Sequence, residues 1–213
     1  MASFSDIMKG VIYAKGRGNF ITPDDFGGKV SSASLRTELV NFNNSRFLIH
    51  VARGLYFFPH IGKDGKQVRP TLFDILRFAE EATKGKVYPT KEAALYLIGA
   101  TEEVVNPLVF YTSGLTKTIN LNSGPEMTFK KLPKSMNLPS FASMKIRTLY
   151  IVYTMTQESR ITKKLTAAMN KFCAQMLPEE FEQDIEFLPL WMKDNLVFPQ
   201  KEKVVKTDED QDE

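Results

Sequence analysis

Two β-rich runs around a glycine turn follow directly on three short helical segments, and this order limits the folds that the chain can adopt. The runs are residues 47–51 and 55–59, with Gly54 between them, which is typical of a β-hairpin. A hairpin after three helices is the element order of a winged helix-turn-helix. In that fold the third helix enters the major groove of DNA, and the hairpin can reach the flanking phosphates.

The first two helices are indicated by the residues at their ends. Ser3 can cap a helix that runs to about Lys15, because apolar residues recur there at helical spacing. Thr22 and Pro23 then begin a short second helix, since proline is favoured in the first helical turn. The glycine pair at positions 27 and 28 ends it.

The third helix begins at Ser31 or Ser32, either of which can cap it. Leu35, Leu39 and Phe42 recur at helical spacing and predict a stripe that faces the core. Side chains outside this stripe should face outward, where arginine suits guanine and asparagine suits adenine. The candidate DNA-reading residues of this helix are Ser32, Ser34, Arg36, Thr37 and Asn41.

Three more candidate DNA-binding residues accompany the hairpin. Arg53 stands beside Gly54 at the turn, where a guanidinium would contact a phosphate. Arg46 precedes the first strand and His50 lies within it, so both join the predicted set. The alternative is that all these side chains form an ordinary solvated surface.

Charge is unevenly spread along the 213 residues. The formal net charge is +3, but residues 1–69 hold ten basic and five acidic side chains. Residues 207–213 hold five acidic side chains and no basic one. The basic region favours a polyanionic partner, here double-stranded DNA, and the acidic end predicts a disordered tail.

A polar connector at residues 60–70 leads to a second series of elements. Its β-rich runs are separated by glycine-containing turns, so we expect an antiparallel meander. The strands should span 108–112, 116–121 and 127–132, after a helix at 72–84, a strand at 86–89 and a helix from Thr90 to about Ile98. The last expected helices span 143–157, 160–176 and 178–193.

The predicted fold class is therefore α+β, in three parts. The parts are a winged helix-turn-helix at 1–60, a mixed domain with a small antiparallel sheet and C-terminal helices at 70–199, and an acidic disordered tail at 200–213.

Several motifs occur in the order found in one bacterial family. Residues 48–59, Leu-Ile-His-Val-Ala-Arg-Gly-Leu-Tyr-Phe-Phe-Pro, resemble the wing of the AbiEi-type antitoxins of type IV, abortive-infection toxin–antitoxin systems. His50 stands where an arginine is expected. Later motifs are similar to a stand-alone subgroup of that family: Tyr88-Pro89-Thr90, Ala93-Ala94-Leu95, Leu97-Ile98-Gly99, Phe110-Tyr111-Thr112-Ser113-Gly114, Ile119 and Phe129-Lys130.

The resemblance covers roughly residues 5–155. It implies a winged-helix transcriptional regulator that represses its own operon. It also implies a second domain that counters a cognate toxin of the nucleotidyltransferase type. The helices after Arg160 match no part of the family pattern.

Motifs for catalysis or cofactor binding are sparse. Cys173 is the only cysteine, which excludes an internal disulfide, and we interpret it as a small buried residue. His50 and His60 have no partners at metal-ligand spacing, and there is no glycine-rich phosphate loop. We therefore expect no enzymatic activity, no cofactor and no metal.

Two other functions remain open. A metal-dependent nuclease needs an acid and a lysine two residues apart on one strand face, whereas Glu126 and Lys130 are four apart. A protein-interaction module would leave the winged helix unused on DNA and would bind a partner through the second domain. The apolar residues between Phe187 and Phe198 either pack on their own domain or form a partner or dimer face.

The N-terminal segment lacks the basic and apolar regions of a signal peptide. No apolar stretch approaches the roughly 20 residues that span a bilayer. We therefore expect a cytoplasmic protein without membrane contact.

Overall fold

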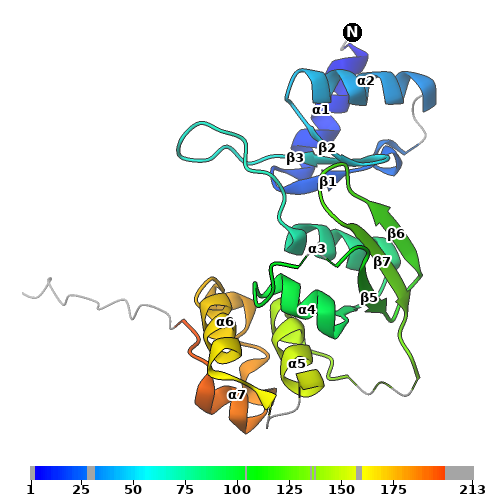
Figure 1. The fold of residues 1–213 in the computed structure, drawn as a ribbon. Coiled ribbons are helices and arrows are strands. Elements are labelled where there is room, and N and C mark those ends of the chain that lie inside the picture. Colours follow the sequence, from blue (N-terminus) through cyan, green and yellow to red (C-terminus); the bar gives the residue numbers. More distant parts are fainter. Residues whose placement is uncertain are drawn as a thin grey trace, which may run out of the picture.

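The computed structural model describes residues 3–27, 32–103, 105–134, 136, 138–156 and 160–199 (Figure 1). These residues form an α+β protein with a three-stranded and a four-stranded sheet, so the predicted fold class is confirmed at this level. Ser31 and the predicted tail at 200–213 lie outside the described residues. In the described part, no helix has the length and apolar character needed to cross a bilayer.

The N-terminal part alternates helices with short strands. Its elements are α1 (Phe4–Lys15), β1 (Asn19–Ile21), the 3-10 helix η1 (Pro23–Phe26), α2 (Ser32–Asn44), β2 (Ile49–Ala52) and β3 (Leu55–Phe58). Ser3 caps α1 as predicted, since its side chain accepts a hydrogen bond from the Asp6 amide at 3.2 Å. The short second helix begins after Thr22 as predicted, although it is a 3-10 helix.

The three strands form an antiparallel sheet in the order β1-β3-β2, against which α1 and α2 pack. The predicted stripe of Leu35, Leu39 and Phe42 is buried, with exposed fractions of 6% or less. It meets Met8 and Ile12 of α1 in one hydrophobic cluster. The elements thus follow the predicted order, while their assignment to a winged helix-turn-helix stays a prediction.

The second part is built around the four-stranded sheet. Its elements are α3 (Leu72–Thr83), β4 (Val87–Pro89), α4 (Lys91–Leu97), β5 (Leu108–Thr112), β6 (Lys117–Asn120), β7 (Glu126–Lys131), α5 (Met144–Thr156) and α6 (Lys163–Cys173). After them come η3 (Pro178–Glu180), η4 (Ile185–Phe187) and α7 (Leu190–Asn195).

The expected antiparallel meander is wrong, because the sheet is mixed. Its order is β4-β5-β7-β6, and β5 pairs with β7 in parallel. The link after β5 is bound to the end of α3: the Leu115 amide donates to the Thr83 carbonyl at 2.8 Å. Gly114 packs so closely on that carbonyl that a Cβ atom would not fit. The end of β5 and the start of β6 both pair near the end of β7, so the link passes that end. Strand β6 then forms one edge of the sheet.

The single helix expected at 178–193 is also wrong. Pro189 lies within this segment, and a proline inside a helix lacks the required N–H and clashes with the preceding turn. Asp184 is buried, and its carboxylate accepts hydrogen bonds from the Ala142 and Ser143 amides at 2.8 and 2.7 Å. These bonds hold residues 178–188 against the start of α5, which favours short turns over one regular helix.

One hydrophobic cluster crosses the 60–70 connector. Phe20 and Phe57 of the first sheet lie in the same cluster as Ile75 and Leu76 of α3. The turn between β6 and β7 also reaches β2, where the Asn122 amide donates to the Val51 carbonyl at 2.8 Å. Figure 1 shows this turn rising to the first sheet. The two predicted parts therefore share one hydrophobic cluster, while the domain boundaries stay a prediction.

This shared core predicts that the two parts unfold together. Phe20→Ala should cost about 3–5 kcal/mol, as expected for a buried phenylalanine. Trp191 is the only tryptophan and lies in the second part. In urea, its fluorescence midpoint should fall in the Phe20→Ala variant and coincide with the loss of helical circular dichroism. An unchanged Trp191 transition would show two independent domains. Phe187→Ala, at a 74% exposed position, is the control.

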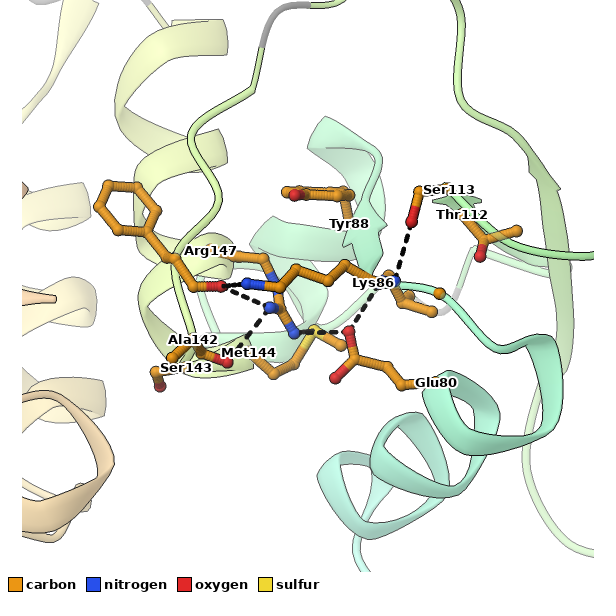
Figure 2. A network of polar contacts seen from close by, with 12 residues as sticks. Glu80, Lys86, Tyr88, Thr112, Ser113, Ala142, Ser143, Met144 and Arg147 are labelled. Atoms are coloured by element: carbon orange, nitrogen blue, oxygen red, sulfur yellow. Dashed lines mark hydrogen bonds and ion pairs between the residues drawn. The ribbon is translucent and has the colours of Figure 1, made fainter. Parts of the chain in front are cut away.

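A buried arginine joins three elements of the second part (Figure 2). Arg147 of α5 is 1% exposed, and its Nη2 donates to Glu80 Oε1 of α3 at 2.6 Å. Its Nη1 donates to the Phe141 and Ala142 carbonyls at 2.7 and 3.2 Å. Glu80 Oε1 also accepts from the Val87 amide of β4 at 2.6 Å. The ion pair therefore fixes α3, β4 and the start of α5 to one another.

Removal of Glu80 should destabilise the fold strongly. Glu80→Ala leaves the Arg147 charge buried without its partner, which typically costs about 3–5 kcal/mol in free energy of unfolding. Glu80→Gln keeps an acceptor and should cost less. Glu81→Ala, at the next and exposed position, should stay within about 0.5 kcal/mol. Urea unfolding of the three variants measures this, and equal stability of Glu80→Ala and Glu81→Ala would contradict it.

Candidate nucleic-acid interface

The exposed side of α2 and the β2–β3 hairpin enclose a hollow of about 450 Å³. Three of the predicted DNA-binding residues line it together: Arg36 from α2, His50 from β2 and Arg53 from the hairpin turn. Its other lining residues are Pro23, Leu39, Val40, Gly54, Tyr56 and Asn122. The hollow thus combines an apolar floor with two guanidinium groups.

Solvent reaches both guanidinium groups of the hollow. Arg36 and Arg53 are exposed, and neither forms an ion pair or hydrogen bond with any described residue. An exposed arginine keeps its donor fork hydrated until a phosphate or a base edge replaces the water. Gly54 has φ of +69° in the turn that carries Arg53, a conformation that glycine adopts without strain.

His50 is half-buried and forms part of the wall of the hollow. Its ring stacks on Tyr56 with the ring centroids 4.8 Å apart. Asn122 Nδ2 lies 3.0 Å from His50 Nδ1 and donates to the His50 carbonyl, also at 3.0 Å. These contacts restrict the orientation of the His50 ring. Burial also raises the pKa of the Tyr56 hydroxyl above its ordinary value.

Three further predicted residues of α2 do not line the hollow. Ser34, Thr37 and Asn41 are exposed on α2, and only the backbone of Ser32 is described. Thr37 Oγ1 donates to the Ala33 carbonyl at 3.1 Å, and Asn41 Nδ2 donates to Glu38 Oε2 at 3.2 Å. The Asn41 amide would have to leave Glu38 in order to read a base.

Arg46 does not line the hollow either. It follows the end of α2 with φ of +60°, and its carbonyl accepts a hydrogen bond from Gln67 Nε2 of the connector. Its side chain is exposed. The structure therefore brings Arg36, His50 and Arg53 together, while Ser34, Thr37, Asn41 and Arg46 do not line this hollow.

Sequence reasoning missed Val40, Tyr56 and Asn122. Val40 is 49% exposed at the rim, where an aliphatic group can contact a thymine methyl. Tyr56 pairs with His50 across the hairpin, and the two rings stack on one another. Asn122 comes from the β6–β7 turn, so no pattern within residues 1–60 indicates it.

A larger hollow, about 900 Å³, lies between α3, α4 and α5. Its charged residues are paired with one another or with Arg147. Lys145 lies 2.7 Å from Glu180, Arg77 lies 3.8 Å from Asp74, and Glu80 holds Arg147. Across the described residues there is no group of three or more His, Cys, Asp or Glu that fits a metal ion. This hollow therefore offers little unpaired charge to a ligand.

The nuclease pair lies on β7. Glu126 and Lys130 are four residues apart, or about 13 Å along a strand. Glu126 Oε1 accepts a hydrogen bond from Thr128 Oγ1 at 3.3 Å. No second carboxylate joins Glu126 in a metal-binding group among the described residues, so the arrangement gives the nuclease reading no support.

Cys173 is fully buried in α6, which confirms its interpretation as a core residue. Burial raises the pKa of its thiol from 9.0 to about 12. A neutral buried thiol is a poor nucleophile, so this residue does not form a catalytic site.

The raised pKa predicts a pH-dependent loss of stability. In the unfolded chain the thiol ionises near pH 9, while the folded protein keeps the proton until about pH 12. The stabilising contribution is therefore complete below pH 9 and is lost as the pH rises from 9 to 12. Melting curves should show a flatter pH response in Cys173→Ala over this range. Rapid alkylation of the native protein at pH 8 would contradict the buried, neutral thiol.

The fold and this hollow define an α+β protein with a small basic site at a helix–hairpin junction. Residues 7–175 match the model of the Family of unknown function (DUF6088), and the chain belongs to that family. Searches of curated proteins and of solved structures give no significant match.

Proposed function

We propose that the protein binds double-stranded DNA through α2 and the β2–β3 hairpin, with residues 1–60 acting as a winged helix-turn-helix. The observation that carries this proposal is the hollow that joins Arg36 and Arg53, two exposed arginines without partners among the described residues. Duplex DNA presents a dense line of phosphates, and arginine binds phosphate and guanine through paired hydrogen bonds.

The two arginines suit different parts of a duplex. Arg53 lies at the hairpin turn, where a side chain meets the sugar–phosphate backbone. Arg36 lies on α2, the helix that would enter the major groove, and shares the hollow with the rim residue Val40. The arrangement supports one positioning contact and one base-reading contact.

The regulatory role follows from the resemblance to AbiEi-type antitoxins. A winged-helix protein of that kind represses its own operon, and its second domain counters a nucleotidyltransferase-type toxin. We propose the same for this chain as a cytoplasmic regulator with a cognate toxin. A nucleotidyltransferase encoded beside the protein should stop growth when it is expressed alone. Co-expression with the protein should restore growth, and this tests the proposed toxin partner.

A protein-interaction role is the second candidate, and one observation favours it. Phe187, Leu190 and Val197 are 72–75% exposed near the end of the described chain. Aromatic side chains such as Phe187 are enriched at protein interfaces, and exposed apolar side chains near one another can mark an interaction site. In this alternative the N-terminal hollow does not contact DNA.

Arg53→Ala and Arg36→Ala should weaken DNA binding in different ways. Loss of Arg53 removes a phosphate contact, so specific and random duplexes should bind more weakly and the log–log salt slope should fall by about one. Loss of Arg36 should cost about 1–3 kcal/mol on the specific duplex and little on random DNA. Fluorescence-anisotropy titrations at several salt concentrations, with the protein's own promoter and a random duplex, measure both.

Arg160→Ala is the matched control, because it removes one exposed arginine far along the chain from the hollow. Melting temperatures should match the parent in all three variants, since neither Arg36 nor Arg53 forms an ion pair or hydrogen bond with a described residue. If both hollow variants bind the promoter like Arg160→Ala, the proposal is overturned and the interaction role takes its place.

A further inference from the structure

We infer that the DNA-contacting surface continues from the hairpin across β6 and β7, so that one duplex lies along both parts of the protein. This inference rests on the proposed function and extends it to residues that the winged helix does not contain. It is carried by a series of adjoining hollows and by the charge of the residues that line them.

The hollows share lining residues and therefore adjoin one another along the surface. The first, between α2 and the hairpin, shares Pro23, Arg53 and Gly54 with a second of about 350 Å³. The second reaches β6 and shares Lys117 and Thr118 with a third of about 430 Å³ on β6 and β7. The path runs from the recognition side of α2, past the hairpin turn, onto the four-stranded sheet.

Basic residues predominate along this path. Among the described residues that line the three hollows, Asp24 is the only acid. The larger hollow between α3, α4 and α5 differs, since three acids and two bases line it. A charge excess of this sign complements a polyanion. The bases along the path are Arg36, Arg53, Lys117, Lys130 and Lys131.

The side chains on β6 and β7 suit a phosphate backbone more than base edges. Lys117, Lys130 and Lys131 are exposed and form no ion pair with any described residue. Thr118 and Thr128 lie opposite each other in the β6–β7 pair and line the third hollow. Hydroxyl and ammonium groups are common phosphate ligands that carry no sequence information. This region would therefore add affinity and leave the sequence preference to α2.

The path is also held in place. The Ala52–Leu121 bridge and the Asn122 hydrogen bonds fasten the β6–β7 turn to β2. A rigid connection means that a duplex seated on the hairpin meets β6 and β7 without a further loss of conformational entropy. A flexible linker between the two parts would not give this advantage.

The triple variant Lys117→Gln, Lys130→Gln, Lys131→Gln tests the inference in the full-length protein. With a random duplex of about 30 base pairs, near three helical turns, the log–log salt slope should fall by about 2.5–3, since each lost phosphate contact removes about 0.9. Affinity near 0.1 M salt should fall by about tenfold or more. The matched Lys→Arg triple variant keeps the charge and should bind like the parent.

The control Lys163→Gln, Lys164→Gln, Lys171→Gln removes the same charge from exposed positions on α6 and should leave the slope unchanged. If the β6–β7 variant binds like this control while Arg53→Ala weakens binding, DNA binding stands and the extended surface is overturned. If neither variant changes binding, or the parent binds no duplex, both proposals fail. If the Gln variant also has a lower melting temperature, its weaker binding could come from lost stability. The Arg variant separates the two causes, because it keeps the charge and must bind like the parent.

Discussion

The ion pair between Arg147 and Glu80 is the contact on which the second part of the structure depends. An arginine buried to 1% exposure must have its charge compensated within the protein. Glu80 supplies this compensation and accepts a hydrogen bond from β4 as well. The guanidinium also binds the carbonyls that lead into α5. The orientation of α3 is thereby fixed, and its apolar side then meets Phe20 and Phe57 of the first sheet.

Helix α3 packs in the same hydrophobic cluster as Phe20 and Phe57 of the first sheet. The polar network that orients α3 therefore also affects where the hairpin lies. Phe73 of α3 extends this connection, since it packs against the central cluster and against Phe172 of α6. The β6–β7 turn adds a second connection, in which Asn122 binds the strand that carries His50. The basic hollow is therefore not an isolated feature of the first sixty residues. Its wall is completed by a residue from the second part, and its geometry depends on the packing between the two parts.

Local signals in the sequence predicted most helices and strands, because caps and turns act over a few residues. Ser3 and Thr90 begin helices through side-chain hydrogen bonds to residues three positions on, and Gly54 permits the hairpin turn. The errors came from contacts between distant residues. Leu115 and Thr83 set the place of β6 in the sheet, and Asp184 binds amides 41 and 42 residues away. The site followed the same division: Arg36 and Arg53 could be predicted from helix order, whereas Asn122 and Lys117 reach the site only through the tertiary fold.

The smaller hollow is the better candidate for a functional region, because its arginines form no ion pair with described residues whereas the charged groups of the larger hollow are paired. In the larger hollow, Lys145 and Glu180 satisfy each other at 2.7 Å and Glu80 is committed to Arg147, so a charged ligand would first have to break contacts that stabilise the fold. Arg36 and Arg53 have no such contacts with described residues, so a phosphate would break no ion pair within the described part of the chain. The cost of binding is therefore lower at the smaller hollow. The neighbouring hollow joins Arg53 to Lys117 on β6, so exposed basic side chains continue along the surface. A polyanion is long enough to contact them all, whereas a small ligand is not.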